Sequence, residues 1–388
     1  MFKLFKYDPE YFIFKYFWLI IFIPEQKYVF LLIFMNLILF HIKFLKTKLI
    51  LKNEILLFLL WSILCFVSVV TSMFVEINFE RLFADFTAPI IWIIAIMYYN
   101  LYSFINIDYK KLKNSIFFSF LVLLGISALY IIQNGKDIVF LDRHLIGLDY
   151  LITGVNTRLV GFMNYPTLNT TTIIVSIPLI FALIKNKMQQ FFFLCLAFIP
   201  IYLSGSRIGS LSLAILIICL LWRYIGGKFA WIKKLIVIFV ILLIILNTEL
   251  LYHEILAVYN SRESSNEARF IIYQESIDKV LENNILFGYG ISEYSVTGTW
   301  LGSHSGYISF FYKSGIVGLI LLMFSFFYVI KKSYGVNGET ALFYFTSLAI
   351  FFIYETIDPI IIILVLFFSS IGIWNNINFK KDMETKNE

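Results

Sequence analysis

Two arginines and one histidine stand beside long apolar stretches, where an ionisable side chain is costly. Arg207 lies between two apolar runs in YLSGSRIGSLSLAI, with hardly any loop to place it in water. Arg269 lies in the first turns of an amphipathic stretch, and His304 directly precedes an apolar run in GSHSGYISFF. Arginine suits phosphate through its rigid fork of donors, and a neutral histidine can accept a proton from a hydroxyl. These residue types indicate anion binding beside a potential general base.

Arg207, Arg158 and His304 also have plain structural explanations. Arg207 could extend its side chain to the membrane interface. Arg158, in NTRLVGFMNYP, could contact lipid headgroups, and His304 could be an interfacial side chain bonded to water. Lys313, about two to three helical turns beyond His304, has no physical explanation from the sequence.

A metal site is the competing explanation for polar residues near the membrane. Glu275, Asp278 and Glu282 share a helical face, but Lys279 lies among them and no histidine stands at ligand spacing. The three cysteines lie in apolar runs, and Glu355 with Asp358 forms an acidic pair without an assigned role. The sequence therefore predicts anion binding with no metal and no cofactor.

The composition places most of the chain in lipid. Of its 388 residues, 60% are hydrophobic and only 14% are charged, whereas about a quarter of an ordinary globular chain is charged. The net charge of +6 forms no basic stripe of the kind that follows nucleic acid. We therefore expect a membrane protein with no nucleic acid partner.

The apolar runs predict an all-α polytopic membrane protein with about 12 transmembrane helices in a single membrane domain over residues 1–388. Most of the 31 basic residues fall in short connections on one side, which places both termini in the cytoplasm. Two large extracytoplasmic loops, 134–166 and 248–303, are long enough to be functional. The expected spans are 11–24, 28–44, 54–75, 86–105, 114–133, 167–184, 190–203, 208–222, 234–248, 306–330, 341–354 and 359–375.

The second large loop contains a predicted amphipathic helix. Ser264 and Glu267 have the spacing of a capping box, and Gly288 and Gly290 permit a tight turn after the helix. The helix could lie on the bilayer surface, or it could roof a cavity and hold Arg269 over the membrane. Its expected apolar face consists of Phe270, Tyr273, Ile277, Val280 and Leu281.

Four segments, in order, resemble the O-antigen polymerase and ligase superfamily of bacterial envelope glycosyltransferases. The resemblance covers residues 155–330, whereas the first 130 residues match only in being membrane spans. The segments are RLVGFMNYP at 158–166, LSGSRIGSLSL at 203–213, EARFIIYQESIDKVLENNILFGYG at 267–290 and GSHSGYISFFYKSGIVGL at 302–319.

The resemblance implies transfer of a glycan from a polyprenyl diphosphate carrier, without a metal, on the outer face of the bacterial inner (cytoplasmic) membrane. It implies that Arg207 and Arg269 hold the pyrophosphate and that His304 is the base. Its implied partners are the lipid-linked oligosaccharide, membrane lipids, and a chain-length regulator and flippase of the same pathway. Supporting roles fall to Arg158, Asn164, Ser303, Ser305 and Gly290.

Polymerase and ligase share fold, donor and catalytic geometry. Many ligases carry an asparagine directly after the histidine, whereas Ser305 follows His304 here. This difference favours a polymerase of O-antigen, capsule or exopolysaccharide and leaves an O-antigen ligase, acting on lipid A-core, as the alternative. A lipid-glycan flippase or transporter is the alternative from another class, although the sequence shows none of the repeats common in transporters.

Overall fold

Helices dominate the computed structural model. It describes residues 8–20, 26–44, 53–73, 79–105, 107–133, 139–140, 143–144, 146–149, 156–159, 166–224, 263–291, 293–355 and 361–387. The helices of this part are α1 (Pro9–Ile20), α2 (Gln26–Lys43), α3 (Asn53–Met73), α4 (Phe79–Phe104), α5 (Tyr109–Ile132), α6 (Pro166–Leu183), α7 (Lys187–Leu203), α8 (Arg207–Tyr224), α11 (Glu263–Asn283), α12 (Gly306–Asn337), α13 (Glu339–Phe351) and α14 (Ile361–Asn387).

Every predicted span within the described residues coincides with one helix, and the span 234–248 lies outside them. Membrane-protein character is therefore confirmed, while the number of spans and their sidedness stay predictions. Four helical stretches of the described part are long and apolar enough to cross a bilayer, and they are Ile55–Met73, Asp85–Phe104, Tyr109–Ile132 and Gly306–Asn337.

The predicted first large loop contains short strands, which the all-α expectation did not include. β1 (Val139–Phe140) pairs antiparallel with β2 (Arg143–His144). β3 (Ile146–Asp149) pairs antiparallel with β4 (Asn156–Leu159), with Ile146 opposite Leu159. Two small hairpins therefore precede α6.

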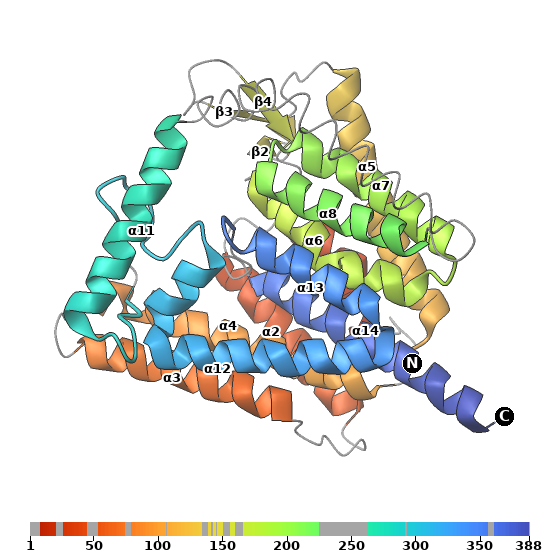
Figure 1. The fold of residues 1–388 in the computed structure, drawn as a ribbon, viewed down its shortest axis with the longest axis horizontal. Helices are drawn as coiled ribbons and strands as arrows, with labels where there is room; N and C mark the ends of the chain where they lie inside the picture. The colour runs from red at the N-terminus through yellow and green to blue at the C-terminus, as the bar shows by residue number, and fades with distance from the viewer. Residues whose placement is uncertain are drawn as a thin grey trace, which may run out of the picture.

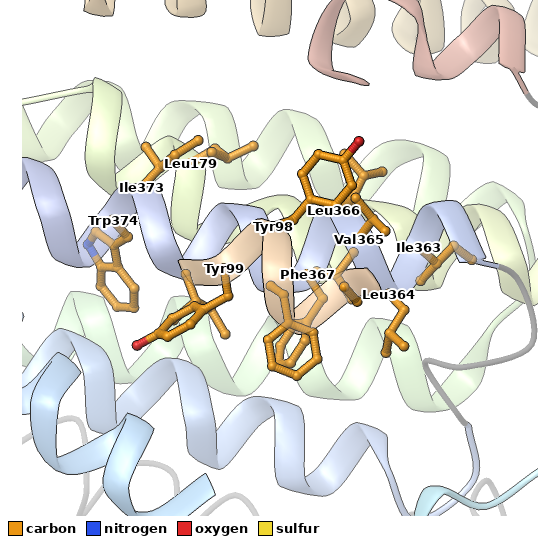
Figure 2. Packing of buried hydrophobic residues seen from close by; sticks show 14 of the residues in the cluster. Tyr98, Tyr99, Leu179, Ile363, Leu364, Val365, Leu366, Phe367, Ile373 and Trp374 are labelled. Carbon is orange, nitrogen blue, oxygen red and sulfur yellow. The ribbon is translucent and has the colours of Figure 1, made fainter. Parts of the chain in front are cut away.

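The centre of the bundle is α14. Residues 361–376 are buried on every side, including polar residues such as Ser369 and Asn375. A helix that is apolar all round belongs inside a structure, and α14 packs against α4 and α6. Figure 2 shows Tyr98 and Tyr99 of α4 and Leu179 of α6 beside the apolar side chains of α14. The small Gly372 lets α14 approach the backbone of α4 closely, because an added Cβ would lie 2.9 Å from the carbonyl oxygen of Tyr99.

The amphipathic helix α11 stands at one end of the bundle and packs against α12 (Figure 1). Its expected apolar face is partly wrong. Val280 is buried as expected, but Phe270 is 67% exposed and Leu281 is 54% exposed. The inward face of α11 instead carries Ile272 and Ser276.

The long helix α12 is broken at Gly315, whose φ of 61° and ψ of −163° are not helical. The segment that follows α11 fits into this break. The backbone amides of Ile316 and Val317 donate to the carbonyls of Ile285 and Leu286, at 3.0 and 3.1 Å. The broken helix thereby joins the second predicted loop to the membrane bundle.

Replacing Gly315 with alanine should destabilise the protein. The φ and ψ of Gly315 fall in a region that only glycine adopts readily, so the strain alone costs about 1–3 kcal/mol. An added Cβ would also lie 2.5 Å from the amide nitrogen of Gly288. Thermal unfolding of the purified protein in detergent should show a lowered Tm. Gly335→Ala, in the same helix and with nothing within 4 Å of its added Cβ, is the control; equal Tm values for the two variants would contradict the prediction.

Candidate functional site

The turn after α13 holds the first residues of α12 in place. The amide of Gly306 donates to the carbonyl oxygens of Phe352 and Glu355, at 2.8 and 3.0 Å. The Ser305 side chain accepts from the amide of Ile308 and donates to the Phe352 carbonyl at 3.3 Å. Ser305 is thus the N-cap of α12, and the backbone of the 352–355 turn is fixed against it.

His304 precedes this cap in a strained conformation. Its φ is 63°, and it is the only non-glycine residue with a positive φ in the described part of the chain. A left-handed backbone at a residue other than glycine is uncommon and clusters at functional sites. The Tyr273 hydroxyl of α11 donates to the His304 carbonyl at 3.0 Å, which holds the residue from the other side.

Arg269 and Glu355 form an ion pair beside His304. The Arg269 Nη2 and Glu355 Oε1 atoms lie 3.9 Å apart, and the guanidinium lies 6.0 Å from the centre of the Tyr354 ring. The Arg269 side chain keeps 22% of its surface exposed, whereas Glu355 is buried. Thr167, in the first turn of α6, is hydrogen-bonded to the Glu355 side chain. We call Thr167, Arg269, Tyr273, His304 and Glu355 the Glu355 cluster.

Burial and charge together set the protonation states in the Glu355 cluster. Burial lowers the pKa of His304 to about 4, and the positive charge of Arg269 adds to this. Burial raises the pKa of Glu355 to about 7, although Arg269 and the bond with Thr167 both lower it. Burial also raises the pKa of Tyr273 to about 12. At pH 7, the His304 side chain is therefore uncharged, and the Glu355 carboxyl group is partly protonated.

The start of α6 connects this cluster to the turn that precedes Arg207. Arg207 is exposed and is the first residue of α8, directly after the turn formed by residues 204–206. The Ser204 and Thr170 side chains of that turn and of α6 are hydrogen-bonded at 2.7 Å. Thr170 follows Thr167 by three residues, so both lie on one face of α6. The first turn of α6 therefore contacts both Glu355 and the turn that carries Arg207.

The other predicted site residues either make contacts that stabilise the fold or lie outside the part of the chain that the structure describes. Ser303 donates to the Trp300 carbonyl, and Ser305 is a helix cap. Gly290 packs against α3, because an added Cβ would lie 2.6 Å from the Ser68 Oγ atom. The backbone of Arg158 lies in β4, but its side chain is not among the described features, and Asn164 lies outside the described residues.

Two members of the cluster are missed by sequence reasoning: Glu355 is noted only as part of an acidic pair without a role, and Thr167 is not singled out. The burial and the partners of Glu355 come from helices distant in the chain, so no local spacing identifies it. Lys313, unexplained from the sequence, lines a small cavity together with the buried Asp85 and with Gly290. A buried carboxylate beside a lysine reduces the cost of placing either charge at that depth.

No group of three or more histidine, cysteine or acidic side chains within the described residues could hold a metal ion. The predicted site residues Arg207 and Arg269, of which Arg269 belongs to the Glu355 cluster, are of a type that suits an anion.

The protonation of Glu355 should be visible by infrared titration. As the pH falls from 8 to 6, a protonated-carboxyl band should appear with a midpoint near 7, and Glu355→Gln should lack it, because its pKa is raised to about 7. Since the folded-state pKa lies above the unfolded value, this group contributes stability that is present at low pH and is lost as the pH rises through 7. The Tm of wild type relative to Glu355→Gln should therefore fall between pH 5 and 8; a band with a midpoint near 4.5 would contradict the assignment.

The comparison with known families concerns the part of the chain that holds Arg207, Arg269 and His304. Residues 191–323 match the family described as O-Antigen ligase. No curated protein matches the chain. The match supports a function of the O-antigen polymerase or ligase type, and with it glycosyltransferase-like activity, and does not distinguish polymerase from ligase. It confirms the resemblance of this region to the O-antigen polymerase and ligase superfamily of bacterial membrane enzymes.

Proposed function

We propose that this protein is a polysaccharide polymerase. It transfers a glycan from a polyprenyl diphosphate carrier to a sugar hydroxyl of another lipid-linked repeat unit, on the outer face of the cytoplasmic membrane. The observation that supports this most is the Glu355 cluster, which brings a neutral histidine just before α12 together with an arginine of α11. Ser305 directly after His304, in place of asparagine, favours polymerase over ligase.

His304 is the proposed base. The acceptor hydroxyl oxygen attacks the anomeric carbon, the bond from that carbon to the diphosphate oxygen breaks, and the hydroxyl proton passes to the imidazole. Attack from the face opposite the leaving group inverts the anomeric configuration. His304 is neutral at pH 7 and is held by its backbone on both sides, so it can accept this proton without first losing one.

The departing lipid diphosphate develops negative charge, and Arg207 and Arg269 are the proposed groups that stabilise it. The N-termini of α6, α8 and α12 add to this effect. Each helix N-terminus carries a partial positive charge, which favours anions. The Gly306 and Ile308 amides of α12 already have hydrogen-bond partners, so α12 contributes through its dipole. Fixed cations and dipoles in a site shielded from water stabilise such charge without reorganisation.

Binding of the donor raises the pKa of the proposed base, His304. Burial, and to a smaller extent the positive charge of Arg269, lower the pKa of His304 in the protein alone. An anionic diphosphate on Arg269 offsets that positive charge and removes its part of the shift, while the part that is due to burial remains. The histidine therefore becomes a stronger base only when the donor is in place. Glu355, which pairs with Arg269 in the protein alone, serves to orient the guanidinium.

Alanine substitutions at His304, Arg207 and Arg269 should each lower glycan transfer by at least about 100-fold, the contribution expected of a general base or of one anion-stabilising group. Transfer should be measured with purified protein and lipid-linked repeat units, after checking that each variant reaches normal membrane abundance. Arg223→Ala is the matched control, because Arg223 lies at the opposite end of α8 from Arg207 and pairs with Glu339. Wild-type transfer by all three variants would exclude the proposed catalytic assignment.

Deletion of the gene should separate the candidate functions through the glycan that remains. Loss of a polymerase should leave single repeat units at the cell surface. Loss of a ligase should leave long glycan stranded on its lipid carrier, and loss of a flippase should trap the repeat unit on the cytoplasmic side. Electrophoresis of surface glycan, together with analysis of the lipid-linked pool, distinguishes the three; the second or third pattern would contradict the polymerase proposal.

A further inference from the structure

A small aromatic hairpin lies just before the catalytic histidine in the chain. Tyr294 and Trp300 form an antiparallel bridge. The Ser295 amide donates to the Thr299 carbonyl at 2.7 Å, and the Leu301 amide donates to the Glu293 carbonyl at 2.9 Å. The Tyr294 and Trp300 rings stack across the hairpin with centroids 3.9 Å apart and an interplanar angle of 26°. Two large rings are thus held in one fixed orientation.

Both rings keep much of their surface accessible. Tyr294 is 51% exposed and Trp300 is 45% exposed. Large side chains with this exposure, held rigidly rather than on a mobile chain, present a ready contact surface at low entropic cost. An accessible aromatic surface of this kind typically marks a binding site.

Hydroxyl groups surround the hairpin turn. The Ser295 and Thr297 side-chain oxygens lie 2.6 Å apart, and those of Thr297 and Thr299 lie 2.8 Å apart. Thr297 is exposed, and its hydroxyl can both donate and accept. The hairpin therefore combines flat apolar ring faces with neutral hydrogen-bonding groups.

The hairpin is anchored to the same elements that hold His304. The Glu275 carboxylate of α11 accepts from the Val296 amide at 3.2 Å. The Ser276 hydroxyl of α11 accepts from the Gly302 amide at 2.8 Å. The amide and hydroxyl of Ser303 both donate to the Trp300 carbonyl, so the turn between the aromatic pair and His304 is closed. Motion of the rings relative to the histidine is therefore restricted.

We propose that Tyr294 and Trp300 form a docking platform for the sugar rings of the glycan acceptor. The proposal rests on the transferase function proposed above. A sugar ring has a face of C–H groups, which packs on an aromatic ring, and an edge of hydroxyls, which Thr297 and Thr299 can hydrogen-bond. The acceptor is favoured over the donor because the hairpin adjoins His304, the base for the acceptor hydroxyl, whereas the donor diphosphate is assigned to the arginines.

The bilayer interface is the other environment in which tryptophan and tyrosine gather. The hydroxyl groups around the hairpin turn and its direct connection to the His304 loop favour a glycan. The two alternatives make different predictions, because a sugar platform acts on glycan affinity and an interfacial anchor acts on contact with lipid.

The test measures the affinity of the purified full-length protein for the free repeat-unit oligosaccharide, released from the host's own surface glycan, by titration calorimetry. Trp300→Ala should weaken binding by about 3- to 10-fold, the range expected from loss of one aromatic contact. Trp300→Phe keeps a ring face and should stay within twofold of wild type. Phe270→Ala, which removes another exposed aromatic from the adjacent α11, is the matched control and should leave binding unchanged.

In transfer assays, Trp300→Ala should raise the KM for acceptor and leave kcat at saturating acceptor close to wild type. Tyr294→Ser, which removes the second ring, should act in the same direction. Unchanged oligosaccharide affinity in both variants would overturn the platform, even if transfer itself is demonstrated. Oligosaccharide binding that depends on Trp300 without any transfer would leave the platform standing and refute the transferase.

Vesicles containing brominated phosphatidylcholine test the interfacial alternative. Brominated lipid quenches the fluorescence of tryptophans in contact with it. The contribution of Trp300 is the difference in quenching between wild type and Trp300→Phe. Little difference is expected if the ring faces a glycan site. Strong quenching that vanishes in Trp300→Phe would place the ring in lipid and overturn the proposal.

Discussion

The Glu355 carboxyl group is buried where three helices meet, and the geometry of the site depends on this burial. The backbone carbonyl of Glu355 accepts a hydrogen bond from the Gly306 amide at the start of α12. The Glu355 side chain contacts Thr167 of α6 and Arg269 of α11. A buried carboxylate is costly unless it is paired and hydrogen-bonded. The ion pair with Arg269 therefore has two effects: it neutralises the Glu355 carboxylate, and it holds α11 against the bundle. It also sets the position of the Arg269 guanidinium.

The break in α12 at Gly315 provides the second constraint on the position of α11. A continuous helix would offer no free amides to the chain that follows α11, whereas the break exposes Ile316 and Val317 to Ile285 and Leu286. The C-terminal end of α11 is thereby tied to α12, and Arg269 near the N-terminal end is tied to Glu355. Because both ends of the helix are held, the strained backbone of His304 between α11 and α12 can persist.

The sequence predicts the membrane helices well, because an apolar run of sufficient length has few alternatives to a span. The bounds differ most at α14, which ends at Asn387 and not at 375, and they differ also at α4, which begins at Phe79 and not at 86. The resemblance led to Arg269 and His304, whose roles stay predictions. Glu355 could not be assigned, because its burial results from packing among α6, α11 and α12, which no local pattern encodes. The face of α11 was misjudged for a related reason. The polar Ser276 is buried to accept from Gly302, whereas a periodicity argument places polar residues outward.

The electrostatics of the site favour a resting state that carries little free charge. His304 is neutral, Arg269 is paired with a carboxylate, and that carboxylate has a pKa near the working pH. In the proposed reaction, the diphosphate of the donor competes for Arg269, and protonation of Glu355 releases the guanidinium to it. The diphosphate carries more negative charge than the single carboxylate that it displaces from Arg269, so the net charge beside His304 becomes more negative and the pKa of His304 rises. In the proposed reaction, the same buried pair that holds α11 in place therefore also couples donor binding to the basicity of His304.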